Sequence, residues 1–137
     1  MAIFVVDASA ALAWCFEDEA SSWSDGLLQR LRQGDGIIVP AHWPTEILNS
    51  LLVASRRKRI KPDQLALFWD ELARLPFEIE PPLSTSQGKA VLVLGEKHGL
   101  TVYDAAYLEL AHRRQLPLGT LDTDLRHAAQ AEGVALL

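Results

Sequence analysis

The chain has 137 residues, of which 49% are hydrophobic, and a formal net charge of −5 at pH 7. This length suits one domain over residues 1–137, and the apolar content excludes a disordered chain. The acidic balance argues against binding nucleic acid through overall charge, but it leaves room for a local basic patch combined with metal ions.

No segment indicates a membrane or an oxidising compartment. No apolar run approaches the roughly 18 residues that a membrane span needs, and the apolar run at the N-terminus is too short for a signal peptide. The single cysteine, Cys15, has no partner for an internal disulfide. We therefore expect a cytoplasmic protein without a membrane partner.

The first half of the chain alternates short strands with helices. It predicts, in order, a strand over Ile3–Val6, helices over Ala8–Phe16 and Ala20–Arg32, a strand over Ile37–Val39, and a helix over His42–Arg59. The two strands are short, apolar and β-branched, which is typical of buried strands. Pro44 suits the first turn of the third helix, where its missing N–H costs nothing.

The second half continues the alternation. It predicts a helix from Pro62, a short strand in "FEIEPP", helices over Ser84–Lys97 and from Thr101, a strand in "LPLGTL" ending at Leu121, a helix over Asp122–Ala131 and a strand over Val134–Leu136. Gly99 is expected to stop the helix before it. Such alternation predicts an α/β fold, with a short, mainly parallel sheet between helical layers on both faces.

Four acidic residues stand at the starts of helices, and at least three of them lie just past a strand. They are Asp7 after the first strand, Glu46 in the first turn after the second, Asp104 in the first turn after Thr101, and Asp122 after "LPLGTL". The carboxyl ends of parallel strands share one edge of the sheet, where ligands bind. We therefore expect the four carboxylates to converge.

Each carboxylate alone has a simpler role. Asp7 and Asp122 suit helix caps, and Glu46 and Asp104 suit the positive end of a helix dipole. Together they would repel one another, because two unit charges at about 4 Å repel by about 4 kcal/mol at an effective dielectric of about 20. A Mg²⁺ or Mn²⁺ ion would relieve this repulsion. The four histidines show no zinc-ligand spacing.

Three further polar side chains lie close to these carboxylates in the sequence. Ser9 follows Asp7 by two residues and Thr120 precedes Asp122 by two, so either hydroxyl could orient a carboxylate or serve as a cap. Asp124 lies about 200° around a helix from Asp122. From that position Asp124 could contact the site through a water molecule, or its charge could stabilise the positive end of the helix dipole.

Four segments, in order and spacing, resemble the PIN-domain ribonucleases, and most of all the VapC-type toxins of bacterial toxin–antitoxin pairs. They are "VVDASAALAW", "PAHWPTEILNSLL", "TVYDAAYLELA" and "GTLDTDL". The resemblance covers essentially the whole chain and implies a PIN-like three-layer α/β/α sandwich. The family's metal-binding acidic positions match Asp7, Glu46, Asp104 and Asp122, and its supporting polar positions match Ser9, Asn49 and Thr120.

The resemblance implies a Mg²⁺- or Mn²⁺-dependent endoribonuclease of a type II toxin–antitoxin system. It also implies an RNA substrate, a homodimer and a small VapB-type antitoxin that blocks the cleft. An alternative is a PIN-like binding or regulatory module without catalysis. A phosphoacceptor domain is disfavoured, because Asp7 has no acidic neighbour and "LPLGTLD" has no lysine.

Basic and aromatic residues could either contact RNA or have a structural role. One interpretation of the run "SRRKRIK" is a solvated helix end. The other is a contact with the RNA backbone, made by Arg56, Arg57, Lys58 and Arg59. A second and weaker candidate for such contacts is the pair of Arg113 and Arg114. Trp43 could stack on a base, although packing in the core or a dimer interface is the simpler interpretation.

Overall fold

The computed structural model describes residues 1–137 and has one four-stranded sheet in the order β3-β2-β1-β4. The strands are β1 (Ile3–Val6), β2 (Gly36–Val39), β3 (Phe77–Ile79) and β4 (Leu118–Gly119). Every neighbouring pair is parallel, and β1 lies between β2 and β4. The carboxyl ends of the strands therefore meet at one edge of the sheet.

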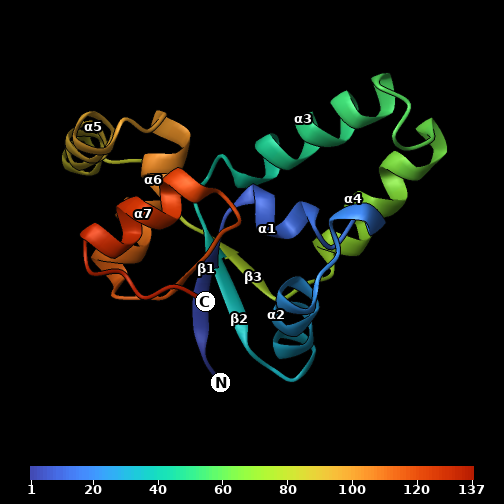
Figure 1. Ribbon diagram of the computed structural model, residues 1–137, viewed down its shortest axis with the longest axis horizontal. Coiled ribbons are helices and arrows are strands. Elements are labelled where there is room, and N and C mark those ends of the chain that lie inside the picture. Colours follow the sequence, from blue (N-terminus) through green and yellow to red (C-terminus); the bar gives the residue numbers. More distant parts are fainter.

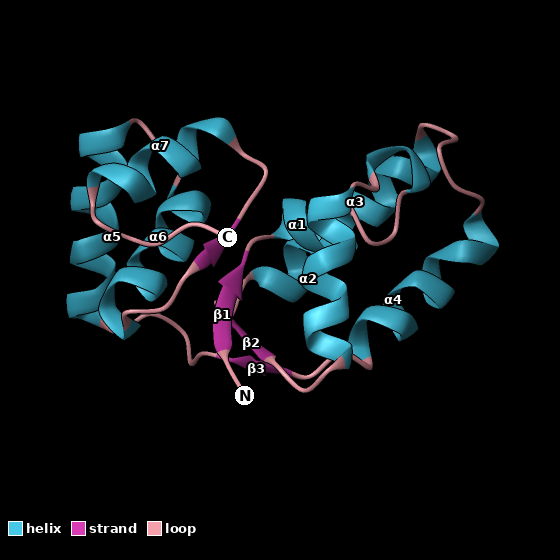
Figure 2. Cartoon of the chain, turned by 60° about the horizontal axis from the view of Figure 1, so that its bottom comes forward, coloured by secondary structure: helices cyan, strands magenta, loops and turns pink.

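Helices cover both faces of this sheet. They are α1 (Ala8–Leu12), α2 (Ser22–Arg32), α3 (Trp43–Arg56), α4 (Leu65–Ala73), α5 (Thr85–His98), α6 (Val102–Arg114) and α7 (Thr123–Ala131), with 3₁₀ turns η1 (Glu17–Glu19) and η2 (Pro62–Gln64). Figures 1 and 2 show α1 to α4 on one side of the strands and α5 to α7 on the other. The expected three-layer α/β/α fold is confirmed. None of the helices is both long and apolar enough to cross a bilayer.

Side-chain caps fix where several helices begin. Ser84 accepts a hydrogen bond from the backbone N–H of Gln87 at the start of α5, and Thr101 accepts one from Asp104 at the start of α6. These bonds satisfy N–H groups that have no partner inside a helix. Gly99 ends α5 in the left-handed conformation, with φ at 64°, as the sequence predicts.

Several predicted boundaries were wrong. The helix expected over Ala8–Phe16 ends at Leu12, where the indole of Trp14 donates to the Ser24 carbonyl (2.8 Å). The helix expected over Ala20–Arg32 starts at Ser22, because Ser21 caps it.

Two other errors concern the end of α3 and the C-terminal strands. α3 stops at Arg56, since the chain turns through Lys58 at a φ of 61°. The strand in "LPLGTL" shrinks to β4, and Val134–Leu136 forms only a single bridge from Leu136 to Leu118.

Trp43 and helix α6 are both deeply buried. Trp43 is fully buried and its ring packs against Phe77, with ring centroids 5.2 Å apart, so it belongs to the core. In α6, all residues of Ala105–Ala111 are buried. The reason is that α6 packs against β1, β4, α5 and α7.

Candidate functional site

Asp7 follows β1 directly and is only 3% exposed. Its Oδ1 accepts hydrogen bonds from the backbone N–H of Ala10 (3.0 Å) and the hydroxyl of Ser9 (2.7 Å). Its Oδ2 accepts one from the hydroxyl of Thr120 (2.5 Å). The structure therefore brings Ser9 and Thr120 to this carboxylate and fixes its orientation at the end of the central strand.

The loop between β4 and α7 is tied to the start of α1 by the same two hydroxyls. The Ser9 hydroxyl accepts from the backbone N–H of Leu121 (3.1 Å), and the Thr120 hydroxyl accepts from that of Asp122 (3.0 Å). Asp122 in turn caps α7 by accepting from the N–H of Leu125 (2.8 Å). These contacts place Asp122 near Asp7, although the two are far apart in the sequence.

Glu46 and Asp104 face the site from the first turns of α3 and α6. The Glu46 carboxylate accepts a hydrogen bond from the hydroxyl of Tyr107 (2.9 Å), which lies one turn after Asp104. The ring of His42 packs edge-on against Tyr107, with centroids 5.0 Å apart. Its Nε2 lies 3.7 Å from Glu46 Oε1, too far for a hydrogen bond. Tyr107 was not predicted as a site residue, although its i+3 spacing from Asp104 on the same helix could have indicated it.

Burial and the charges of neighbouring carboxylates raise the pKa values of three of these four side chains. Burial is the main reason that the pKa values of Asp7, Glu46 and Asp104 lie above their ordinary values. Repulsion between carboxylates raises these pKa values further. The charge of Asp122 raises the pKa of Asp7, and the charges of Asp104 and Asp7 raise that of Glu46. The pKa of Asp104 is raised by the charges of Asp122, Asp7 and Asp124. Asp7 and Asp104 each repel Glu46 and are each repelled by Asp122, so the four charges interact in pairs through Asp7 and Asp104.

No lysine or arginine pairs with any of the four carboxylates. No three His, Cys, Asp or Glu side chains stand close enough together to share one ion directly. Mg²⁺, however, usually keeps several waters and binds only one or two carboxylates of the protein. Each carboxylate oxygen also has more than one lone pair, so Asp7 can accept hydrogen bonds and still bind an ion. A group of carboxylates without a cationic partner thus fits a divalent cation held partly through water.

Two predicted supporting residues lie at the margin of the site. Asn49 lies on α3 one turn after Glu46, is exposed, and makes no side-chain hydrogen bond. Asp124 is exposed in the first turn of α7, where its charge still raises the pKa of Asp104. Neither residue is in contact with Asp7.

The predicted basic run lies far from the carboxylates. α3 and α4 form an arm that projects from the sheet, and the run stands at its outer end (Figure 1). Ten residues of helix separate Arg56 from Glu46, which is about 15 Å. Arg59 is engaged within the chain, because its guanidinium pairs with Asp18 (2.8 Å) and lies 4.3 Å from the centre of the Phe16 ring. Arg56, Arg57 and Lys58 are exposed.

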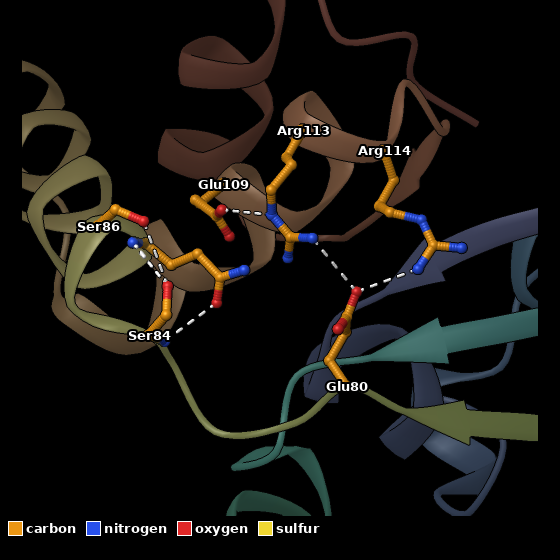
Figure 3. A network of polar contacts seen from close by, with 7 residues as sticks. Glu80, Ser84, Ser86, Glu109, Arg113 and Arg114 are labelled. Carbon is orange, nitrogen blue, oxygen red and sulfur yellow. Dashed lines mark hydrogen bonds and ion pairs between the residues drawn. The ribbon is translucent and has the colours of Figure 1, made fainter.

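The second basic pair belongs to an ion-pair network on the other side of the sheet (Figure 3). Arg113 Nε donates to the buried Glu109 (2.7 Å), and Arg114 donates to Glu80 (3.1 Å). Arg113 also lies 3.5 Å from Glu80. The network joins α6 to the segment that follows β3. Both guanidinium groups therefore have partners within the chain.

The raised pKa of Asp7 predicts how the metal-free protein responds to Asp7→Asn. A raised pKa in the folded state means that ionised Asp7 lowers the stability of the folded protein, and this penalty disappears as pH falls and the carboxyl is protonated. Asparagine caps a helix about as well as aspartate. We therefore expect Asp7→Asn to be more stable than the wild type at pH 7 in EDTA, and to lose this advantage toward pH about 4.

Urea unfolding of both proteins across this pH range, in EDTA, checks the expectation. His42, whose pKa is lowered by burial, affects both proteins alike because Asp7 does not act on it. Glu46 and Asp104 lose the repulsion from Asp7 in the variant, which adds to the advantage of the variant at pH 7. An advantage of the variant that grows as the pH falls would contradict the predicted sign.

Comparisons with known proteins show the family and the fold of the chain. The PIN domain family matches residues 4–131. The chain is 31% identical over 121 residues to Ribonuclease VapC3 of Pyrobaculum aerophilum, covering 88% of this chain and 90% of that protein.

Solved structures share the fold. The crystal structure of PAE2754 from Pyrobaculum aerophilum has a TM-score of 0.69 at 22% identity, covering 98% of this chain and 83% of that one. The structure of VapBC2 from Rickettsia felis, bound to a DNA fragment from their promoter, has a TM-score of 0.66 at 15% identity, covering 98% and 97%.

Proposed function

This chain belongs to the PIN-domain family, and on that premise we propose that it is a metal-dependent endoribonuclease that hydrolyses RNA phosphodiester bonds. We also propose that it is the toxin of a type II toxin–antitoxin pair, since its relative of 31% identity is named Ribonuclease VapC3. The observation that carries the proposal is the group of Asp7, Glu46, Asp104 and Asp122, which lie near one another without a cationic partner. Such a group would repel a phosphate unless a cation were bound to it.

Each carboxylate has a proposed role. Asp7, held by hydrogen bonds, and Asp104 would bind Mg²⁺ or Mn²⁺ directly, and Glu46 and Asp122 would complete the site or hold metal-bound water. A bound divalent ion supplies activation of water and stabilisation of the leaving oxygen. Ser9 and Thr120 keep Asp7 oriented, and Asn49 and Asp124 would act from the margin through water.

One assay tests the proposed function. Purified protein is incubated with mixed RNA in Mg²⁺, in Mn²⁺ or in EDTA. We expect cleavage with either metal and none in EDTA. Intact RNA under all three conditions would overturn the proposal, and metal binding without cleavage would indicate a PIN-like binding module instead.

Asp122 and Asp124 should differ in their effect on cleavage. Asp122 lies beside Thr120 and Asp7, and asparagine can replace it as the cap of α7. We expect Asp122→Asn to lower the initial rate by at least about tenfold, and Asp124→Asn to lower it clearly less. Initial rates at saturating Mn²⁺, with circular dichroism to confirm folding, measure this. A larger loss at Asp124 would show that the two roles are reversed.

The proposed partners are RNA, a VapB-type antitoxin and a second copy of the chain. Exposed apolar side chains offer surfaces for the two protein partners: Leu48 and Leu52 on α3, Leu67 on α4, and Leu92 and Val93 on α5. Arg56, Arg57 and Lys58 are the candidates for contact with the RNA backbone, which would make binding depend on salt. We place the protein in the cytoplasm with its RNA substrate.

A further inference from the structure

A single buried hydroxyl connects the elements that carry three of the carboxylates. Tyr107 is fully buried on α6, one turn after Asp104. Its hydroxyl donates to Glu46 Oε1 on α3 at 2.9 Å. The backbone N–H of Ala8, the residue after Asp7, lies near enough to this phenol oxygen to lower the pKa of Tyr107. The phenol therefore lies where α1, α3 and α6 meet.

Glu46 depends on this contact for the orientation of its carboxylate. Its side chain is 32% exposed, and the Tyr107 hydroxyl is the only hydrogen-bond donor to its carboxylate. Asp104 and Asp7 repel it from within the site. His42 cannot replace Tyr107, because its Nε2 lies 3.7 Å away and makes no hydrogen bond. Without the phenol hydroxyl, repulsion would move Glu46 toward solvent.

We infer that Tyr107 is a positioning residue, which holds the Glu46 carboxylate inward so that it can take part in binding a divalent cation. The inference rests on the proposed function. Tyr107 does not itself touch the metal or the RNA; it acts through Glu46. Loss of its hydroxyl should therefore weaken metal binding, as the loss of outer partners of metal ligands generally does.

The chain provides a matched control for this contact. Tyr103 lies one turn earlier on α6 and packs against the same His42 ring, with centroids 5.6 Å apart. Its side chain is 62% exposed, and its hydroxyl makes no hydrogen bond within the chain. Tyr103→Phe and Tyr107→Phe remove the same atom from neighbouring tyrosines, and only the second breaks a bond to Glu46.

Direct titration with Mn²⁺, followed by the electron paramagnetic resonance signal of the free ion, tests the inference without using activity. We expect Tyr107→Phe to raise the Kd for Mn²⁺ by about tenfold, and Tyr103→Phe to leave it within about twofold. The Mn²⁺ concentration for half-maximal RNA cleavage should rise by the same factor in Tyr107→Phe. Excess Mn²⁺ should then restore most of its kcat.

A double-mutant cycle shows whether Tyr107 acts through Glu46. In a Glu46→Gln background, Tyr107→Phe should change the Kd for Mn²⁺ by less than about twofold, because the carboxylate that it positions is gone. An equal tenfold loss in both backgrounds would overturn the inference.

Two further outcomes would also overturn it. One is an unchanged Kd in Tyr107→Phe, with or without a lower Tm, which would leave the tyrosine only a packing role. The other is a wild type that binds no Mn²⁺. The proposed function is judged separately, by whether the wild-type protein cleaves RNA, so a cleaving wild type with an unaffected Tyr107→Phe defeats this inference alone.

Discussion

Asp104→Asn should reduce the initial rate of RNA cleavage by at least about 100-fold. This is the upper end of the loss expected for an outer partner of a metal ligand, and a direct ligand should reach or exceed it. The fold should survive, because Thr101 caps α6 through the backbone N–H of residue 104 and not through its side chain. Asparagine also removes repulsion from Asp122 and Asp7.

Initial rates at saturating Mn²⁺, compared with circular dichroism and Tm in EDTA, separate lost chemistry from lost folding. An Asp63→Asn variant, altered at an exposed carboxylate in η2, should retain full activity. In cells without the antitoxin, the wild type should arrest growth, and Asp104→Asn should be expressed harmlessly. Equal tolerance of both proteins would count against a toxin.

Mn²⁺ should stabilise the folded protein. At a free concentration of about 100 times Kd, linkage raises the free energy of unfolding by about 2.7 kcal/mol. The ion relieves the repulsion among Asp7, Asp104 and Asp122 that is present without it. Asp7→Asn should gain far less at the same concentration, because it loses a proposed ligand. Urea unfolding with Mn²⁺ and with EDTA measures the difference.

The order of stability at pH 7 should therefore reverse with the metal. In EDTA, Asp7→Asn should be the more stable protein, because it lacks a buried charge of raised pKa. In excess Mn²⁺, the wild type should be the more stable one. Equal Mn²⁺-induced gains in the two proteins would contradict a site shared by Asp7.

The placement of the carboxylates could be predicted because it depends on local patterns. Asp7 ends a β-branched strand, and Thr101 caps the helix that carries Asp104 in its first turn. The end of α5 at Gly99 could be predicted for the same reason. Gly99 adopts the left-handed conformation and its N–H bonds to the last turn of its own helix, so no distant residue is needed. The parallel sheet then follows from the alternation of strands and helices, and it brings the carboxylates to one edge.

Contacts between distant residues could not be predicted in this way. Tyr107 reads as one more core residue of α6, and only the fold places its hydroxyl on Glu46, 61 residues away. Arg59 belongs to a basic run, yet its partner Asp18 is 41 residues away. The sequence left two roles open for Trp43, and packing against Phe77 of β3 decided between them.

The pairing of Asp7 with Thr120 has a consequence for synthesis of the protein. The two residues are 113 positions apart, and β1 lies between β2, which is made soon after it, and β4, which is made much later. During translation, Asp7 is made long before Thr120, whose hydroxyl donates to its carboxylate. A nascent chain that has not reached Thr120 also lacks Asp122, so the four carboxylates cannot take up their arrangement until both residues have been made.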